Sequence, residues 1–149
     1  MKELYYIYNN EAIASCVFLS VLKQTQTLDI ACSCLILPFL LDDRTVSYFA
    51  NNNDIELKQM IKDQPRLFVS FNKRYLSLLP ITINSLMLLM KSNQISIGKD
   101  IVLNNFTDFS IPYTCGDRFN KIRAILPQFL SIIEKYSIGQ MYKLLNIQL

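Results

Sequence analysis

The sequence predicts a mainly α-helical protein with a short β-hairpin, arranged like a winged helix. Apolar residues recur at spacings of three and four along most of the 149 residues, which is typical of helices packed around a core. The strand pattern is confined to Ile95–Ile97 and Ile101–Leu103, which flank the turn Gly98-Lys99-Asp100. A helix pattern runs directly into this hairpin, as in a winged helix. With no linker or repeat in the chain, we expect one compact domain over 1–149.

The N-terminal half is predicted to contain four helices with polar caps. Asn9 and Asn10 can cap a helix that runs to about Thr25. After a polar turn, the segment 29–41 is apolar on nearly every side and should be the central helix. Two short helices should follow. The first should run to about Ala50 and the second to about Lys62, capped by Asp42 or Asp43 and by Asp54 respectively.

Pro65 suits the first turn of the helix that precedes the hairpin. The apolar residues of this helix are Phe68, Phe71, Tyr75, Leu78, Leu79, Ile83, Leu86 and Met90. Residues 104–114 should form a loop, and Asp117 should cap a late helix. The seam of that helix is Phe119, Ile122, Leu126, Phe129, Ile133 and Tyr136.

Ser137 and Gln140 have the spacing of a capping box, which predicts a final helix to about Leu145. The last residues, 147–149, are a candidate third strand for the hairpin.

Three prolines lie inside helical patterns. Pro38 is expected to end or kink the central helix, because a proline ring displaces the carbonyl four residues earlier. Pro80 should give a kinked long helix, or two helices that meet at this point. Pro127 should kink the late helix.

The composition favours binding over chemistry. The chain has no histidine, the side chain whose ordinary pKa lies nearest neutrality and the commonest metal ligand. Without it the sequence offers no catalytic set, metal site or cofactor motif, so we predict a protein that is not an enzyme. Half of the residues (51%) are hydrophobic and only 18% are charged, so part of the apolar surface should meet a partner.

Charge, cysteines and hydropathy bear on nucleic acids, redox state and membranes. The net charge is +3, with basic residues scattered rather than gathered into the stripe of a nucleic-acid binder. The cysteines (Cys16, Cys32, Cys34 and Cys115) form no C-x-x-C pair, and we expect reduced, buried thiols in a cytoplasmic protein. No signal peptide is visible. The apolar runs 28–41 and 78–90 are shorter than the ~20 residues of a membrane span and should be core helices.

Charged and aromatic clusters supply candidate partner-binding residues. Asp42 and Asp43 read as a helix start, with Arg44 as a surface or interface residue. Lys73-Arg74 could contact a phosphate, although a solvated helix face is the simpler interpretation. Tyrosine is enriched in interfaces, and a cluster of three lies near the N-terminus. These tyrosines are Tyr5, Tyr6 and Tyr8.

The hairpin is the other candidate contact. Because side chains alternate along a strand, Ser96 and Val102 should face away from the isoleucines that pack on the core. An unpaired hairpin edge could then accept a partner strand, unless residues 4–8 or 147–149 fill it. We predict that Lys99 and Asp100 at the turn bind a partner. Arg44 and Arg74 are the expected charged anchors, and their charge reversal should leave the fold unchanged.

Taken in order, these segments resemble a known family. The matching residues include Leu37-Pro38-Phe39-Leu40-Leu41 followed by Arg44-Thr45, then Leu79-Pro80-Ile81-Thr82, and the closing Tyr142-Lys143-Leu144-Leu145. This pattern resembles the middle component of the three-component ABC (ABC-3C) systems, bacterial defence operons that include the Lamassu type. Members of that family often have a histidine after the first motif and a glycine before the hairpin. Here those places hold Asp42 or Asp43, and Asn93.

The resemblance implies an adaptor in an anti-phage complex. Its partners would be an ABC ATPase like SMC or Rad50 and a nuclease-like effector, with DNA reached only through the complex and no membrane association. The subunit would hold the effector in check or pass on a signal. The alternative is a stand-alone winged-helix DNA-binding regulator. A regulator should carry basic residues in the helix that enters the hairpin, and residues 80–90 contain none, which favours the adaptor.

Overall fold

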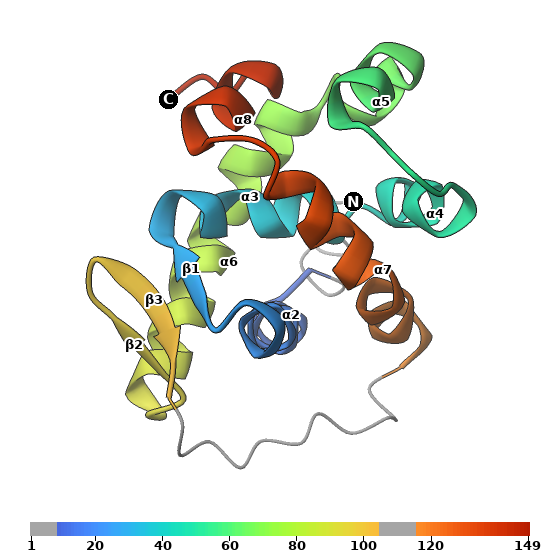
Figure 1. The fold of residues 1–149 in the computed structure, drawn as a ribbon. Helices are drawn as coiled ribbons and strands as arrows, with labels where there is room; N and C mark the ends of the chain where they lie inside the picture. The colour runs from blue at the N-terminus through green and yellow to red at the C-terminus, as the bar shows by residue number, and fades with distance from the viewer. Residues whose placement is uncertain (1–8, 105–115) are drawn as a thin grey trace.

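The computed structural model of the chain describes residues 9–104 and 116–149. In this part of the chain there are seven α-helices, one 3-10 turn and one three-stranded sheet (Figure 1). The helices are α2 (Glu11–Thr25), α3 (Ile30–Leu40), α4 (Asp43–Asn51), α5 (Leu57–Asp63), α6 (Phe71–Lys91), α7 (Asp117–Ile133) and α8 (Ile138–Leu144), and the 3-10 turn is η1 (Pro65–Leu67). The mainly α-helical class with a short hairpin is confirmed.

Several helix starts follow the capping residues in the sequence. Asn10 Oδ1 accepts from the backbone N–H groups of Ala12 and Ile13 at 3.0 and 3.2 Å, which opens α2. Asp29 Oδ1 does the same for α3, with Ala31 N at 2.7 Å. These carboxylate and amide oxygens satisfy N–H groups that have no partner within the helix. The capping box of Ser137 is confirmed, because both of its hydrogen bonds are present.

Other helix starts differ from the prediction. α5 begins at Leu57, with Glu56 rather than Asp54 before it. Pro65 opens the 3-10 turn and not α6, which begins only at Phe71. The N-cap of α7 is Gly116, and Asp117 is its first residue. The predicted loop over 104–114 lies outside the described residues, except for residue 104.

The prolines interrupt hydrogen bonds without ending their helices. α6 runs unbroken through Pro80, α3 through Pro38 and α7 through Pro127. Of the two alternatives predicted at Pro80, two separate helices is wrong, because residues 71–91 form a single long helix. Because α6 is one continuous helix, its helical periodicity continues past Pro80. Residues on either side of Pro80 therefore share the same exposed and buried faces.

The sheet contains a strand that the sequence pattern did not reveal. Strands β2 (Ile95–Ile97) and β3 (Asp100–Leu103) form the predicted hairpin, and β1 (Thr27–Asp29) pairs antiparallel with β3 in the order β1-β3-β2. Residues 147–149 are not the third strand. The backbone N–H of Gln148 instead donates to Asn72 Oδ1 at 2.8 Å.

The two sides of the hairpin have the predicted orientation. Ile95 and Ile101 are buried, while Ser96 and Val102 face away from the core. In the register, Val102 lies between Thr27 of β1 and Ser96 of β2. The chain turns into β2 at Asn93, whose φ of 60° is a left-handed value that asparagine and glycine tolerate best.

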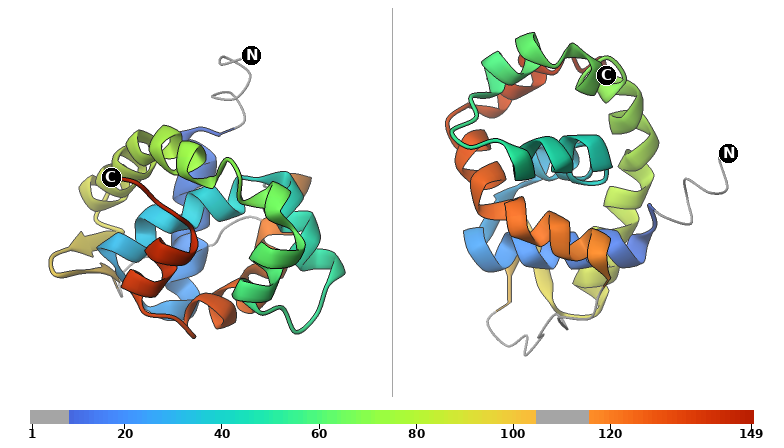
Figure 2. Two further views of the ribbon diagram at one scale, coloured as in Figure 1. Left: turned by 90° about the horizontal axis from the view of Figure 1, so that it is seen from above. Right: turned by 90° about the vertical axis from the view of Figure 1, so that its right-hand side faces the viewer.

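Helices α2 and α3 lie at the centre of the molecule. Each of them contacts α6, and they contact α7 and α4 respectively. The sheet packs beside α2 and the end of α6, whereas α4 and α7 lie on the opposite side (Figure 1). Figure 2 shows α6 running along one flank of the molecule from the hairpin to the α5 end.

A cluster of phenylalanines joins four helices in one core. The ring of Phe39 on α3 lies 4.8 Å from Phe71 on α6 and 5.2 Å from Phe129 on α7. Phe129 in turn lies 5.8 Å from Phe49 on α4, in an edge-to-face arrangement. Such pairs add to the stabilisation that burial gives. All four rings are essentially inaccessible to water, and α3 is the most apolar helix, as its sequence predicts.

Candidate functional site

Helix α6 buries one face and exposes a second face that is also apolar. Its buried residues include Tyr75, Leu78, Thr82, Ser85 and Leu89. The exposed apolar residues of α6, which we call the α6 outer face, are Leu76, Pro80, Ile83, Met87 and Leu88. The first four recur at spacings of four, three and four, so they form one row along the helix.

The α6 outer face is large for a single helix. The exposed fractions of Leu76, Ile83 and Leu88 are 50, 52 and 54%. Between Leu76 and Leu88 the helix rises about 18 Å at ~1.5 Å per residue. Single exposed apolar residues are ordinary on protein surfaces, but a contiguous row marks an interaction site. The apolar run 78–90, which includes Ile83, is predicted to be a core helix. For Ile83 this prediction is wrong, because Ile83 lies on the same side of α6 as the exposed Leu76 and Pro80.

The charges of α6 lie at its ends. Lys73 and Lys91 are exposed one turn beyond the apolar row on either side. The helix contains no acidic residue. Two acids from other elements reach it: Asp42 Oδ2 lies 3.9 Å from Arg74 Nη2, and Glu11 Oε1, at the start of α2, accepts from Asn84 Nδ2 at 3.2 Å. The outer face is thus mainly apolar, with Asn84 as an exposed polar residue beside it and lysines at both ends.

Arg74 does not belong to this surface. Its side chain is only 12% exposed and lies between α6, α3 and η1. The guanidinium donates to the carbonyl oxygens of Pro38 at 3.2 Å and Leu67 at 3.0 Å, and to Ser70 Oγ at 2.9 Å. The predicted role as an exposed anchor, whose charge reversal leaves the fold unchanged, is therefore wrong: a carboxylate at this position would face those carbonyls.

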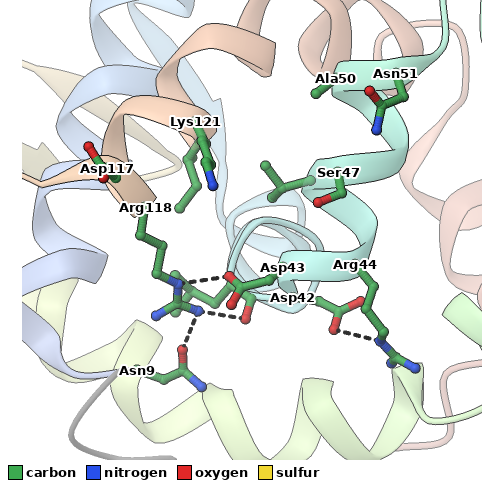
Figure 3. Close-up of a pocket in the computed structure, with 13 residues that line it drawn as sticks. Asn9, Asp42, Asp43, Arg44, Ser47, Ala50, Asn51, Asp117, Arg118 and Lys121 are labelled. Carbon is green, nitrogen blue, oxygen red and sulfur yellow. Dashed lines mark hydrogen bonds and ion pairs between the residues drawn. The ribbon is translucent and has the colours of Figure 1, made fainter.

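A pocket lies between α4 and α7, and Arg118 lies in its wall (Figure 3). Its Nε donates to Asp43 Oδ1 at 2.9 Å, and its Nη2 donates to Asn9 Oδ1 at 2.8 Å and to the carbonyl of Leu41 at 2.9 Å. One guanidinium therefore joins the starts of α2, α4 and α7 to the end of α3. Lys121 also lines the pocket.

The arrangement of the pocket points to a structural role for Arg118. Its hydrogen bonds are directed at protein acceptors, and two acids of the pocket wall, Asp42 and Asp43, form ion pairs with arginines. Asp42 accepts from Arg44 at 3.4 Å and from the Thr45 hydroxyl at 2.6 Å, which fixes the start of α4. Among the described residues, no group of three or more histidine, cysteine, aspartate or glutamate side chains could hold a metal ion.

Two thiols and two tyrosines meet where α3, α6 and α8 come together. The Tyr142 hydroxyl donates to the carbonyl of Ala31 at 2.8 Å and lies 3.3 Å from the Tyr75 hydroxyl. Burial, with a smaller contribution from Asp29, raises the pKa of the Cys32 thiol to about 11. Burial likewise raises the pKa values of Cys34 and Tyr142. These groups are thus held in their neutral forms, which makes the thiols poor nucleophiles.

None of the helices that the described residues form is long and apolar enough to cross a membrane. A family model for the ABC-three component (ABC-3C) system Middle Component 3 matches residues 2–116. The chain belongs to this family. No curated protein and no solved structure matches it significantly.

The Middle Component 3 match ends immediately before α7, but the core does not. Phe129 on α7 packs against Phe39 and Phe49, which lie inside the matched region. Arg118, just beyond the match, binds Asp43 and Leu41 within it. The C-terminal helices therefore complete the fold of this family member.

The predicted partner-binding residues are not brought together by the fold. Lys99 and Asp100 are exposed at the hairpin turn, on the far side of α2 from α4 (Figure 1). Arg44 is 59% exposed at the rim of the pocket. Tyr5, Tyr6 and Tyr8 lie outside the described residues. Sequence reasoning missed the α6 outer face and Arg118. The sequence does contain a signal for the α6 outer face, because apolar residues occupy both sides of the 71–91 helix.

Proposed function

We propose that the chain is a non-catalytic adaptor in a bacterial anti-phage complex of the ABC-3C class, of the Lamassu type. It would bridge an ABC ATPase like SMC or Rad50 and a nuclease-like effector in the cytoplasm, and it would control activation of the effector. Membership of the Middle Component 3 family supports a place in a multi-subunit system. The observation that carries the proposal is the α6 outer face, whose exposed apolar side chains favour contact with another protein.

The order of the helices and strands helps to decide whether the α6 outer face binds DNA or protein. The order helix, strand, helix and then helix, hairpin, with β1 paired to β3, supports the proposal of a winged-helix arrangement in which α4 and α5 would be insertions. In that architecture α6 is the helix that reads the major groove of DNA. DNA recognition needs cations and hydrogen-bonding side chains along the helix. α6 presents apolar side chains there instead, with lysines only at its ends.

The test is reconstitution of the complex with the subunits that neighbouring genes encode. The full chain is co-expressed with the ATPase and the effector, each carrying a different tag, and the complex is isolated through one tag. We expect all three subunits to co-purify, and effector nuclease activity to depend on the presence of this chain. Failure of the chain to bind either subunit would overturn the adaptor proposal.

The DNA-binding regulator is the alternative, and the helix–hairpin order is the observation that favours it. Fluorescence anisotropy with a labelled duplex distinguishes the two functions. A regulator binds specific DNA tightly, with an affinity that falls steeply as salt rises. We expect only weak, sequence-independent binding by the isolated chain.

A further inference from the structure

We propose that the α6 outer face binds one amphipathic helix of a partner subunit, and that this helix carries acidic residues at both ends of its apolar stripe. The inference rests on the adaptor function proposed above and specifies the kind of partner. The row Leu76, Pro80, Ile83 and Met87 has the spacing of a helix–helix seam. A straight row of this form fits a second helix packed along it, as in helix–helix pairing.

The charges define the occupant further. Lys73 and Lys91 are 18 residues apart on one face of α6, which places them about 27 Å apart along the axis. This separation exceeds the Debye length at physiological salt by about threefold, so one acidic residue of a partner could not interact with both lysines. A partner helix that spans the row would place one acidic residue near each end.

The same charges oppose a second copy of this chain on the face. In an antiparallel α6 pair related by a two-fold axis, Lys73 would face Lys91 of the other copy. In a parallel pair, each lysine would face its own equivalent. Both arrangements bring like charges together at both ends of the apolar row, which disfavours self-association relative to an acidic partner.

The first experiment tests the face by charge introduction. Ile83→Glu/Met87→Glu is prepared in the full chain, and Leu149→Glu is the control because Leu149 is 97% exposed and is not part of the α6 outer face. Glutamate is at least as good a helix former as isoleucine or methionine, so circular dichroism and Tm should be unchanged. We expect the α6 variant to lower recovery of the three-subunit complex at least about tenfold, and the control to leave it unchanged. Wild-type recovery with the α6 variant would overturn the inference.

The second experiment identifies the occupant. A photo-crosslinking amino acid replaces Leu88, which is 54% exposed, and the assembled complex is irradiated and digested for mass spectrometry. A crosslink to a partner segment with helical apolar periodicity and flanking Asp or Glu is the expected result. A crosslink to DNA, to a second copy of this chain, to residues 1–8 of the same chain or to a non-helical segment would overturn the inference.

A third experiment reverses the charges of the two lysines and tests their contribution separately from that of the apolar residues. Lys73→Glu/Lys91→Glu should weaken complex recovery at low salt, and the loss should shrink as salt rises because surface charges are screened. Equal recovery of this variant and the wild type at low salt would contradict the acidic partner. If the wild type binds no neighbouring subunit at all, the proposed function fails. If it binds but all α6 variants bind equally well, only the present inference fails.

Discussion

Arg118 Nε lies 2.9 Å from Asp43 Oδ1 and so ties the first turn of α7 to the first turn of α4, 75 residues earlier. The Asp43 carboxylate is 75% exposed, so solvent screens this ion pair and it contributes little. The hydrogen bonds from the same guanidinium to Asn9 and to the Leu41 carbonyl are less exposed. They are the contacts that stabilise the junction.

This division of roles predicts different effects for the two partners. Arg118→Met keeps much of the aliphatic stem and removes the donors, and should lower the free energy of unfolding by about 1–3 kcal/mol. Asp43→Asn should change it by less than about 0.5 kcal/mol. Urea denaturation followed by circular dichroism measures both. Equal losses for the two variants would mean that the ion pair, and not the carbonyl and amide contacts, stabilises the junction.

Arg74 should behave as a core residue despite its charge. Arg74→Met should destabilise the fold by about 2–3 kcal/mol, because it leaves the carbonyls of Pro38 and Leu67 without this donor. Lys73→Met is the matched control on the neighbouring, exposed position, and should shift the unfolding free energy by less than about 0.5 kcal/mol. An unchanged urea midpoint for the Arg74 variant would show that the hydrogen bonds of Arg74 do not stabilise the fold.

The capping box should be measurable at the C-terminal end. Ser137→Ala removes the acceptor of the Gln140 N–H, now at 3.2 Å, and should cost about 1 kcal/mol. Hydrogen exchange of the α8 amides should quicken more than exchange in α3. Ser131→Ala, at an exposed position within α7, is the control and should be neutral or slightly stabilising because alanine favours helix.

The Cys32 thiol gives a pH dependence with a defined sign. Its pKa is raised from 9.0 to about 11 in the folded chain by burial, so the unfolded chain loses this proton first as pH rises. The contribution of Cys32 to stability is therefore complete below pH 9 and falls between pH 9 and about 11. Guanidinium unfolding of the wild type and Cys32→Ala, under reducing conditions, isolates the effect. As the pH rises through that range, the free energy of unfolding of the wild type should fall relative to that of Cys32→Ala. A difference that stays constant with pH would contradict the prediction.

The parts of the fold that local chemistry determines could be predicted from the sequence. Asn10, Asp29 and Ser137 are short polar side chains directly before apolar helical patterns, and each caps the helix that follows. The hairpin likewise follows from β-branched residues around a turn. In these cases the deciding interactions lie within three residues of one another, so a single sequence contains them.

The parts of the fold that depend on contacts between distant residues could not be predicted from the sequence. β1 is three residues long and is a strand only because β3 lies beside it. The burial of Arg74 depends on Pro38, 36 residues earlier. The phase of α6 past Pro80 depends on whether the surrounding packing holds the helix together, and α2 and α3 both contact it. None of these relationships has a local signature.

The two faces of α6 place one segment under two kinds of selection. Leu78, Thr82 and Leu89 are buried within the chain, so the substitutions they allow are set by neighbouring side chains that the same gene encodes. Leu76, Ile83 and Met87 would meet another subunit, so their substitutions would be compensated in a different gene. Among related operons, the buried residues of α6 should therefore covary with other residues of this chain. The residues of the α6 outer face should covary with residues of a partner gene.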